Sequence, residues 1–276
     1  MHMIWILIPL FFLTIYQSAL TDYLLINPEY YQLNAYTWES DDFRAMRLGD
    51  EVLSLSELDY DQLTTWMIEE QYDLRGINKQ KEKDWKVVES AIVRQKPVEF
   101  KKLRNAYQMV LSDISCFPIP ASLHSETPFV SYEDSFGDPR TYGGERLHEG
   151  CDIMGMEQPR GFYPILSMTG GTVEQVGWLE KGGWRIGIRA PLGAYFYYAH
   201  LYEYAREWKV GDKVEPGTLL GYMGDSGYGI QEGTVGNFAV HLHLGIYLMT
   251  DHYQEMSVNP YWILRYSERF IRKADY

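Results

Sequence analysis

The side chains best suited to chemistry form the pattern His241-Leu242-His243 in the last fifth of the sequence. In a β-strand, residues i and i+2 face the same side, so both imidazoles would project into one space while Leu242 packs behind them. Two imidazoles on one face are costly in an ordinary core, because each buried ring nitrogen needs a polar partner. A metal ion with a catalytic neighbour would satisfy both rings. The pattern therefore predicts a metal site.

A second group of candidate ligands lies upstream, in His148-Glu149-Gly150-Cys151-Asp152. Imidazole and carboxylate together suit Zn²⁺, which accepts nitrogen and oxygen donors at about 2.0–2.2 Å. His148, Asp152 and one histidine of the HxH pair would supply three protein ligands and leave a fourth position open. Three ligands with an open position are typical of catalytic zinc, whereas structural zinc is closed by a fourth ligand.

Two neighbours of these ligands are not predicted to bind the metal. Glu149 could be the general base of a damaged HExxH helix, but the glycines around it make a poor helix, so we interpret it as a solvated loop residue. Cys151 adjoins Asp152, and adjacent residues of an extended chain point in opposite directions. Cys116 and Cys151 are the two cysteines of the chain. They could form one disulfide or remain two buried thiols, and the sequence leaves both possibilities open.

A further histidine and a serine motif need separate interpretation. His200 ends the aromatic run Tyr198-Ala199-His200, where a histidine by itself is more often structural than catalytic. Gly224-Asp225-Ser226-Gly227 copies the nucleophile motif of trypsin-like serine proteases. In those enzymes the histidine lies far upstream of the serine, whereas here 26 positions separate the two (226 − 200). We therefore interpret the motif as a turn between strands and exclude the serine-protease mechanism.

The segment before these motifs has a helical pattern between residues 60 and 114. Apolar side chains repeat at three- and four-residue intervals, first from Leu63 and again from Phe100. Pro97 stands where a first-turn proline would begin the second of these helices. We predict two or three helices, whose amphipathic faces dock on the following domain rather than on a partner.

The pattern changes to short strands after the Phe-Pro-Ile-Pro junction at residues 117–120, where the prolines disfavour a helix. Most of the 24 glycines lie beyond it, between apolar runs such as 194–198 and 242–248. Short strands at this spacing predict an antiparallel sheet domain. The expected organisation is a signal anchor or signal peptide at 1–20, a polar stretch and helical accessory region at 21–115, a β-rich domain at 116–262, and a C-terminal tail at 263–276.

Composition and the N-terminal run limit the partners and the location. The formal net charge of −13 excludes a nucleic-acid partner, because phosphate binding needs clustered lysines and arginines. Residues 3–16 are uncharged and suit a signal-peptide core, and continuing to Leu20 gives a marginal membrane span. No small-x-small cleavage site follows cleanly, so we rank an uncleaved anchor above a cleaved signal peptide, and a buried helix third. No Lys or Arg precedes Arg44, which predicts that the body of the protein lies outside the cytoplasm.

Taken in order, the HxxxD pair, the Tyr-Ala-His strand and the HxH motif resemble the lysostaphin-type (LytM-like) zinc endopeptidases, which cut peptidoglycan peptides. Residues 171–183 are similar to the first hairpin of that family, and residues 210–224 to its glycine-punctuated hairpin. The resemblance covers about residues 136–250 and does not reach the helical region. It implies an α+β protein in which an antiparallel β-sheet LytM-like peptidase domain follows a small helical region.

The resemblance also implies roles for individual residues. His148 and Asp152 would be zinc ligands, with His243 as the third, and His200 and His241 would be the catalytic pair that does not bind the metal. Zinc held in this way activates a water molecule and polarises the scissile carbonyl. His241 could take the proton of the water, and His200 could stabilise the oxyanion or donate to the leaving amine. The sequence does not divide these two roles.

One departure from the family lies at residues 228–238, a stretch longer and more polar than a minimal hairpin. Loops around a groove set the fit of a substrate, so the substrate specificity is not predicted. Tyr142, Tyr198 and Tyr228 could line the groove, but in a chain with 23 tyrosines we prefer to interpret all three as ordinary packing.

Two functional hypotheses from different classes follow. The first is a zinc metalloendopeptidase, anchored to the outer face of the membrane or secreted to the cell wall, that hydrolyses peptide cross-links of bacterial peptidoglycan. The alternative is a non-catalytic cell-envelope or sporulation scaffold with the same fold, and a secreted peptidase acting on proteins ranks third. The complete set of five site residues favours the first hypothesis. Protein partners and the oligomeric state are not predicted.

Overall fold

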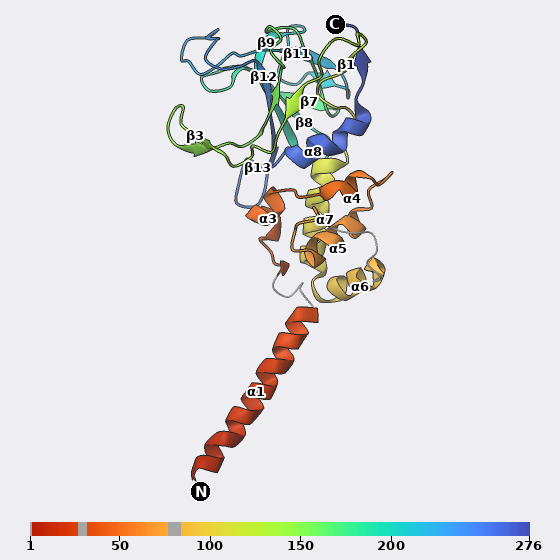
Figure 1. The fold of residues 1–276 in the computed structure, drawn as a ribbon, viewed down its shortest axis with the longest axis vertical. Helices are drawn as coiled ribbons and strands as arrows, with labels where there is room; N and C mark the ends of the chain where they lie inside the picture. Colours follow the sequence, from red (N-terminus) through yellow and green to blue (C-terminus); the bar gives the residue numbers. More distant parts are fainter. Residues whose placement is uncertain (1, 27–31, 77–83) are drawn as a thin grey trace.

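The computed structural model describes residues 2–26, 32–76 and 84–276, which form three successive parts (Figure 1). A long single helix stands at one end, a group of shorter helices lies in the middle, and a β-sheet domain forms the other end. The two ends of the chain lie at opposite ends of the structure. Helices followed by a mainly antiparallel sheet confirm the predicted α+β fold.

Helix α1 (His2–Ile26) extends away from the rest of the protein (Figure 1). Its segment Leu7–Leu24 is long and apolar enough to cross a membrane, and none of that segment is buried inside the protein. Phe11 and Phe12 are each 64% exposed. Tyr23, near the end of the helix, hydrogen-bonds Gln95 of the helical group. The possibility of a buried N-terminal helix is therefore wrong for the part of the chain that the structure describes.

Each of the three longest helices of the helical group begins at an N-cap or first-turn residue that the sequence shows. Asp59 and Asp84 are N-caps whose carboxylates accept backbone N–H groups of the first turn, and Pro97 opens the last helix as predicted. The described helices are η1 (Thr37–Glu39), α3 (Asp41–Arg44), α4 (Gly49–Leu53), α5 (Tyr60–Glu69), α6 (Trp85–Gln95) and α7 (Pro97–Leu111). The helices expected between residues 60 and 114 are thus present.

The helical group packs directly against the β-sheet domain. Buried apolar side chains of both parts belong to one continuous hydrophobic cluster. Polar contacts close the same junction: the Arg44 guanidinium donates to the backbone carbonyl of Ser257 (2.9 Å), and Arg269 donates to the backbone carbonyl of Leu55 (2.6 Å). Helix α8 (Tyr261–Ser267) lies at this boundary and contacts α4. The prediction that the helices dock on the following domain is confirmed.

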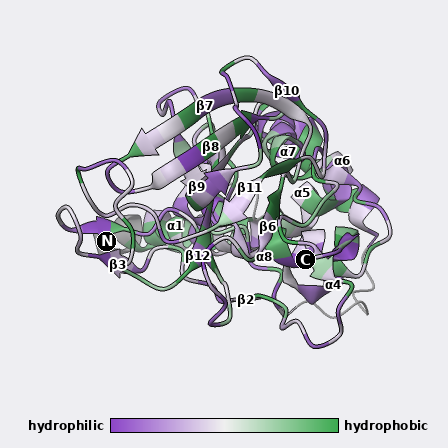
Figure 2. Cartoon of the chain, turned by 90° about the horizontal axis from the view of Figure 1, so that it is seen from above, coloured by the Kyte–Doolittle hydropathy of each residue, from purple (hydrophilic) through white to green (hydrophobic). Residues whose placement is uncertain are grey.

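The β-sheet domain is built on the strand order β10-β7-β8-β9-β12-β5-β2, in which every neighbouring pair is antiparallel. Seen from above, β7, β8 and β9 lie side by side and carry both hydrophobic and hydrophilic residues (Figure 2). The strands of this path are β2 (Ser131–Tyr132), β5 (Cys151–Met154), β7 (Gly171–Leu179), β8 (Gly183–Arg189), β9 (Tyr195–Tyr204), β10 (Lys213–Val214) and β12 (His241–Leu248).

Shorter strands complete the domain. Strand β11 pairs with β6 and β9, β13 pairs with β12, and β3 and β4 form a separate hairpin. Near the C-terminus, β14 pairs in parallel with β1, so this part of the expected tail is ordered against the domain. The bounds are β1 (Ala121–Ser122), β3 (Pro139–Arg140), β4 (Arg146–Leu147), β6 (Pro164–Leu166), β11 (Leu219–Met223), β13 (Met256–Val258), η2 (Glu268–Phe270) and β14 (Lys273–Ala274).

The register of β12 positions the functional side chains. Strand β12 lies between β5 and β9, and His243 is paired with Asp152 on one side and with Ala199 on the other. Leu242 is fully buried, while His241 and His243 on either side of it face the opposite way. Three strands therefore bring side chains distant in sequence to one point of the sheet.

Candidate active site

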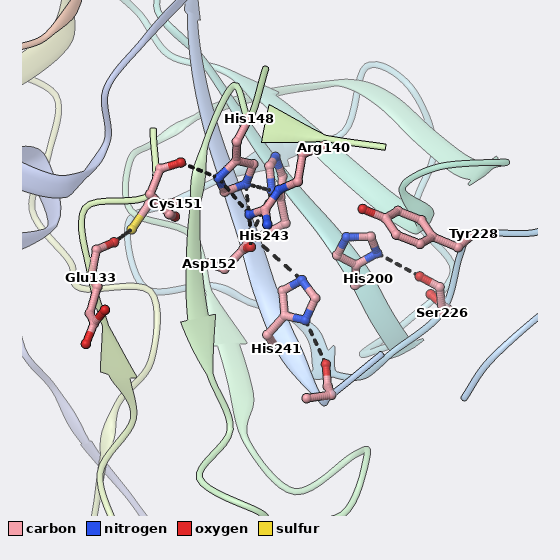
Figure 3. Close-up of polar contacts among 12 residues, drawn as sticks. Glu133, Arg140, His148, Cys151, Asp152, His200, Ser226, Tyr228, His241 and His243 are labelled. Atoms are coloured by element: carbon pink, nitrogen blue, oxygen red, sulfur yellow. Dashed lines mark hydrogen bonds and ion pairs between the residues drawn. The ribbon is translucent and has the colours of Figure 1, made fainter. Parts of the chain in front are cut away.

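Three of the predicted site residues converge on one small space (Figure 3). His148 Nε2 lies 3.1 Å from Asp152 Oδ1, His243 Nδ1 lies 3.0 Å from the same oxygen, and the two ring nitrogens are 2.9 Å apart. Ligands at ~2.0–2.1 Å in a tetrahedral zinc site stand about 3.3 Å from one another. The triangle of donor atoms is therefore close to the size that a zinc ion requires.

The direction of the His148 ring is set by a backbone group. His148 is only 2% exposed, and its Nδ1–H donates to the carbonyl of Ser135 (2.9 Å). Arg140 Nη2 lies 3.0 Å from the same Nδ1, so this side of the ring is fully engaged and Nε2 is the ring nitrogen that faces the other two donors. A proton on Nδ1 would leave the Nε2 lone pair to a metal. The chemistry of this donor set, two imidazole nitrogens and one carboxylate oxygen, fits Zn²⁺.

Arg140 holds the carboxylate in place from behind. Its guanidinium donates to Asp152 Oδ2 (2.7 Å), which leaves Oδ1 directed toward the two histidines. Burial opposes ionisation of Asp152, but its hydrogen bonds with His148 and His243 outweigh burial and hold its pKa below the usual range. The carboxylate is therefore ionised. Sequence analysis did not single out Arg140, because nothing in the local pattern shows that β3 passes beside β5.

The other two predicted residues lie across a cavity of about 130 Å³ that all five line. His200 Nδ1–H donates to the carbonyl of Ser226 (2.8 Å), and His241 Nδ1–H donates to the carbonyl of Ala239 (2.7 Å) (Figure 3). Each ring therefore presents an Nε2 lone pair as its remaining polar atom. His241 Nε2 is 3.7 Å from Asp152 Oδ1, and the His200 and His241 ring centroids are 4.7 Å apart.

His200 occupies an unusual backbone position. Its φ of +64° lies in the left-handed region, which side-chain-bearing residues seldom adopt and which recurs at functional sites. Its N–H donates to the carbonyl of Gly182 (2.8 Å). Burial, reinforced by the charges of His241 and His243, lowers the pKa of His200 well below its usual value. His200 is therefore neutral around pH 7.

The Gly-Asp-Ser-Gly motif supports His200 and is not a nucleophile site. Ser226 is 1% exposed; its hydroxyl donates to the carbonyl of Leu201 (2.6 Å) and accepts the N–H of Trp184 (3.0 Å). Gly183 has a φ of +62°, and a Cβ there would collide with the Ser226 carbonyl. The motif lies between β11 and β12 as predicted, but as an irregular segment with a bridge from Gly224 to His241 rather than as a turn. No feature of the sequence indicated that the carbonyl of Ser226 directs the His200 ring.

The three tyrosines considered as possible groove residues, Tyr142, Tyr198 and Tyr228, differ in whether they reach the cavity. Tyr198 is fully buried and its hydroxyl accepts the N–H of Met168 (2.8 Å), which is ordinary packing as expected. Tyr228 lines the cavity, so the packing interpretation is wrong for it. Its ring stacks on Tyr142, with centroids 4.3 Å apart and planes 1° from parallel. Tyr197, which sequence analysis did not consider, lines the cavity too.

The remaining neighbours of the ligands behave as their positions suggested. Cys151 is buried and its thiol donates to the carbonyl of Glu133 (3.2 Å), away from the donor triangle (Figure 3). Both Cys116 and Cys151 are free, so of the two possibilities the structure has two thiols. Burial raises the pKa of Cys116 to about 11. Glu149 lines the cavity but is not one of the converging donors.

Comparison with known proteins gives consistent matches. Residues 146–260 match the family model described as peptidase family M23. The L-Ala–D-Glu endopeptidase of Bacillus subtilis (strain 168) is 42% identical over 172 residues, which are 62% of this chain and 49% of that protein. This chain thus matches about half the length of that curated relative.

One solved structure extends the likeness to most of the chain, the helical part included. A crystal structure from Ruminococcus gnavus of LytM, a candidate glycyl-glycine endopeptidase, is 41% identical with a TM-score of 0.75, and the match covers 89% of this chain and 97% of that one. The catalytic domain of lysostaphin, an antimicrobial peptidase from Staphylococcus simulans, is 26% identical with a TM-score of 0.39, covering 49% of this chain and 92% of that one.

Proposed function

The chain belongs to peptidase family M23, and on that basis we propose that it is a zinc metalloendopeptidase that hydrolyses peptides of bacterial peptidoglycan, cross-links included. The observation that carries the proposal is the convergence of His148 Nε2, Asp152 Oδ1 and His243 Nδ1 within 3.1 Å of one another. Two imidazole nitrogens and a carboxylate oxygen that all point at one another are the donor set that a single divalent cation requires.

His148, Asp152 and His243 would hold the zinc ion. Bound there, zinc supplies a Lewis acid that polarises the scissile carbonyl and makes a water molecule acidic at neutral pH. Arg140 keeps Asp152 Oδ1 directed at the ion by binding the other carboxylate oxygen. The proton transfers are assigned to His241 and His200, which line the cavity beside the ligands.

His241 is assigned the role of general base. Its Nδ1–H is held by the carbonyl of Ala239, so its Nε2 can accept a proton from the attacking water. This Nε2 lies 3.7 Å from Asp152 Oδ1, so it faces the three candidate ligand atoms without being one of them. His241 is half-buried whereas His200 is buried, so His241 is the more accessible of the two rings to the attacking water.

His200 is assigned the transfer to the leaving amine. Its Nδ1–H is held by Ser226, so the proton that His241 takes from the water would pass to Nε2 of the neighbouring His200 ring. The two ring centroids are 4.7 Å apart, and from Nε2 the proton would pass to the amine nitrogen as the C–N bond breaks. Burial makes the protonated ring unfavourable, as the lowered pKa of His200 reflects, so the ring readily gives that proton up. The protonated ring can also donate to the oxyanion before it releases the proton.

The names of the two relatives describe different bonds. One is the bond between L-Ala and D-Glu, which adjoins an acidic residue, and the other is a bond between two glycines, which bears no charge. Peptidoglycan peptides contain residues of both kinds. The activity proposed for this chain therefore includes a choice between an acidic and a neutral substrate.

We place the site outside the cytoplasm and assign membrane attachment to α1. The helix is apolar over Leu7–Leu24, and the rest of the described chain buries none of this segment. Anchoring there would keep the active site within reach of the cell wall. The helical group then acts as a spacer of packed helices between the membrane and the β-sheet domain.

The proposal is tested with the full chain in detergent and a digest of defined muropeptides analysed by mass spectrometry. We expect cleavage that stops after treatment with a chelator and returns when Zn²⁺ is added. A protein that retains one zinc ion per chain but cleaves no muropeptide would contradict the enzymatic proposal. That outcome would favour the scaffold alternative.

A further inference from the structure

The wall of the active-site cavity carries two cations that the mechanism does not use. Arg146, the first residue of β4, and Lys181, in the turn between β7 and β8, line the same cavity as the candidate zinc ligands. We refer to Arg146 and Lys181 as the cation pair. The chain as a whole has a net charge of −13, so basic side chains gathered at one point are not a consequence of composition.

Neither member of the cation pair is neutralised by a carboxylate among the residues that the structure describes. Arg146 donates to the hydroxyl of Tyr228 (3.1 Å), and its buried Nε has no hydrogen-bond partner. Lys181 is exposed and takes part in no ion pair in the described structure. Asp152 and Glu149 are the carboxylates that line this cavity; Arg140 is bound to Asp152, and Glu149 forms no described ion pair.

The backbone makes room for Lys181 beside Arg146. A Cβ on Gly143 would come within 2.7 Å of Lys181 Cε, so the lysine side chain passes over this glycine, in the turn between β3 and β4 that leads to Arg146. Gly143 has a φ of +70°, a conformation that suits glycine. The two cations, which are 35 positions apart in sequence (181 − 146), are thus brought to one side of the cavity.

Arg146 is half-buried, so its guanidinium is the member of the pair whose charge water screens less. The unpaired Nε of Arg146 adds a desolvation cost. An anion in the cavity would give this Nε a hydrogen-bond partner and would face both cations. Arginine and lysine are the side chains that bind carboxylates through charge-assisted hydrogen bonds.

We propose that the cation pair binds a free carboxylate on the residue that flanks the scissile bond, so that the enzyme selects acidic stem-type peptides over glycine bridges. A glutamate in a peptide always keeps one carboxylate free, whichever of its two carboxyl groups forms the next bond. A glycine offers no such group. This inference rests on the proposed function and adds the substrate class to it.

The test uses zinc-loaded full chain in detergent and two synthetic peptides that differ in one group. Both contain L-Ala followed by a second residue, which is D-Glu in one peptide and its carboxamide counterpart D-Gln in the other; pentaglycine is the third substrate. We expect kcat/KM for the D-Glu peptide to exceed that for the D-Gln peptide by about tenfold to a hundredfold, the range of one or two charge-assisted hydrogen bonds.

Variants then assign that preference to the cation pair. Lys181→Gln and Arg146→Gln should each lower kcat/KM for the D-Glu peptide and leave the D-Gln peptide little changed, so that the ratio approaches one. Lys181→Arg keeps the charge and should restore the ratio. Lys209→Gln, at an exposed lysine paired with Glu207, is the matched control and should keep the wild-type ratio.

The outcomes separate this inference from the proposed function. If pentaglycine or the D-Gln peptide were cleaved as fast as the D-Glu peptide, the proposed selection of acidic peptides would be wrong. The proposal that the protein is a zinc peptidase would be unaffected. A wild-type ratio in both Gln variants would overturn the assignment to the cation pair. Failure of the zinc-loaded protein to cleave any of the three peptides and any muropeptide would overturn the proposed function, and this inference with it.

Discussion

The two halves of the active site are held in different ways. Asp152 and His243 stand opposite each other on paired strands β5 and β12, where the ladder of backbone hydrogen bonds fixes their separation. His200 lies within β9 at an irregularity of its pairing with β8, and its ring and N–H are held by the loop carbonyl of Ser226 and the turn carbonyl of Gly182. The cation pair lies in the β3–β4 hairpin and the β7–β8 turn.

We refer to Asp152 and His243, two of the three proposed metal ligands, as the strand-held half; the third, His148, lies between β4 and β5 and is held by the Ser135 carbonyl. We refer to His200 and the cation pair, the residues proposed for transfer to the leaving amine and for substrate selection, as the turn-held half.

The positions of metal ligands must be kept within narrow limits, whereas the positions of residues that contact the substrate can change. A zinc site tolerates displacements of a few tenths of an ångström, which the register of a central strand secures. Turns tolerate substitutions and insertions, so they can change the substrate without disturbing the metal. Substitutions in the strand-held half should therefore abolish metal binding, whereas those in the turn-held half should alter rate or selectivity while the metal stays bound.

The largest effect is expected for His243→Ala. This change removes a donor atom that lies 3.0 Å from Asp152 Oδ1 and 2.9 Å from His148 Nε2, so both zinc and activity should be lost. Zinc content after dialysis, with cleavage of muropeptides, measures both. His124→Ala, at an exposed histidine paired with Asp275, is the control and should retain both. Full zinc content in His243→Ala would show that the ligand assignment is wrong.

His241→Ala should retain zinc and lose turnover by about 10²–10⁴-fold, the usual contribution of a general base. His241 lies two residues from His243 on the same strand face, but its Nδ1 is engaged by Ala239 and its Nε2 is outside the donor triangle. The same zinc and cleavage measurements apply. Loss of zinc as complete as in His243→Ala would contradict the division between ligands and proton carriers.

Gly150→Ala should weaken zinc binding by roughly tenfold or more, the scale of a disturbed support for a ligand. A Cβ at residue 150 would lie 2.5 Å from His243 Cε1 and 2.7 Å from its Nε2, so the ring must move. Competition with a chromogenic chelator measures the affinity. Gly76→Ala is the control, because a Cβ there meets nothing within 4 Å. An unchanged zinc affinity in Gly150→Ala would mean that the strand-held half is less rigid than its register suggests.

The smallest effect is expected for Tyr142→Ala, in the β3–β4 hairpin that carries Arg146 of the turn-held half. The change removes the stack on Tyr228, worth about 1 kcal/mol beyond the area it buries, and loosens the loop that carries a cavity residue. We expect a rise in KM of a few-fold with kcat and zinc content retained. Tyr253→Ala, at a tyrosine that is 52% exposed, should change neither constant. A loss of zinc in Tyr142→Ala would contradict the independence of the two halves.

The sequence by itself determined the chemistry of the site and the class of the fold. His241 and His243 alternate with Leu242 at the period of a strand, and that local rule alone predicts two rings on one face. The same local logic predicted the helix opening at Pro97 and the interruption between strands at Gly-Asp-Ser-Gly. Such features depend on neighbours within a few residues, so a linear pattern contains them.

Only the tertiary structure decided which distant groups support and surround that site. Arg140 behind Asp152, the Ser226 carbonyl under His200, the cation pair on the cavity wall and the free state of both cysteines all depend on how separate segments pass one another. A hydrogen bond needs its two atoms within about 3 Å, and no spacing in the sequence fixes that distance for residues on different strands and turns. Strand register and close packing fix it once the chain has folded.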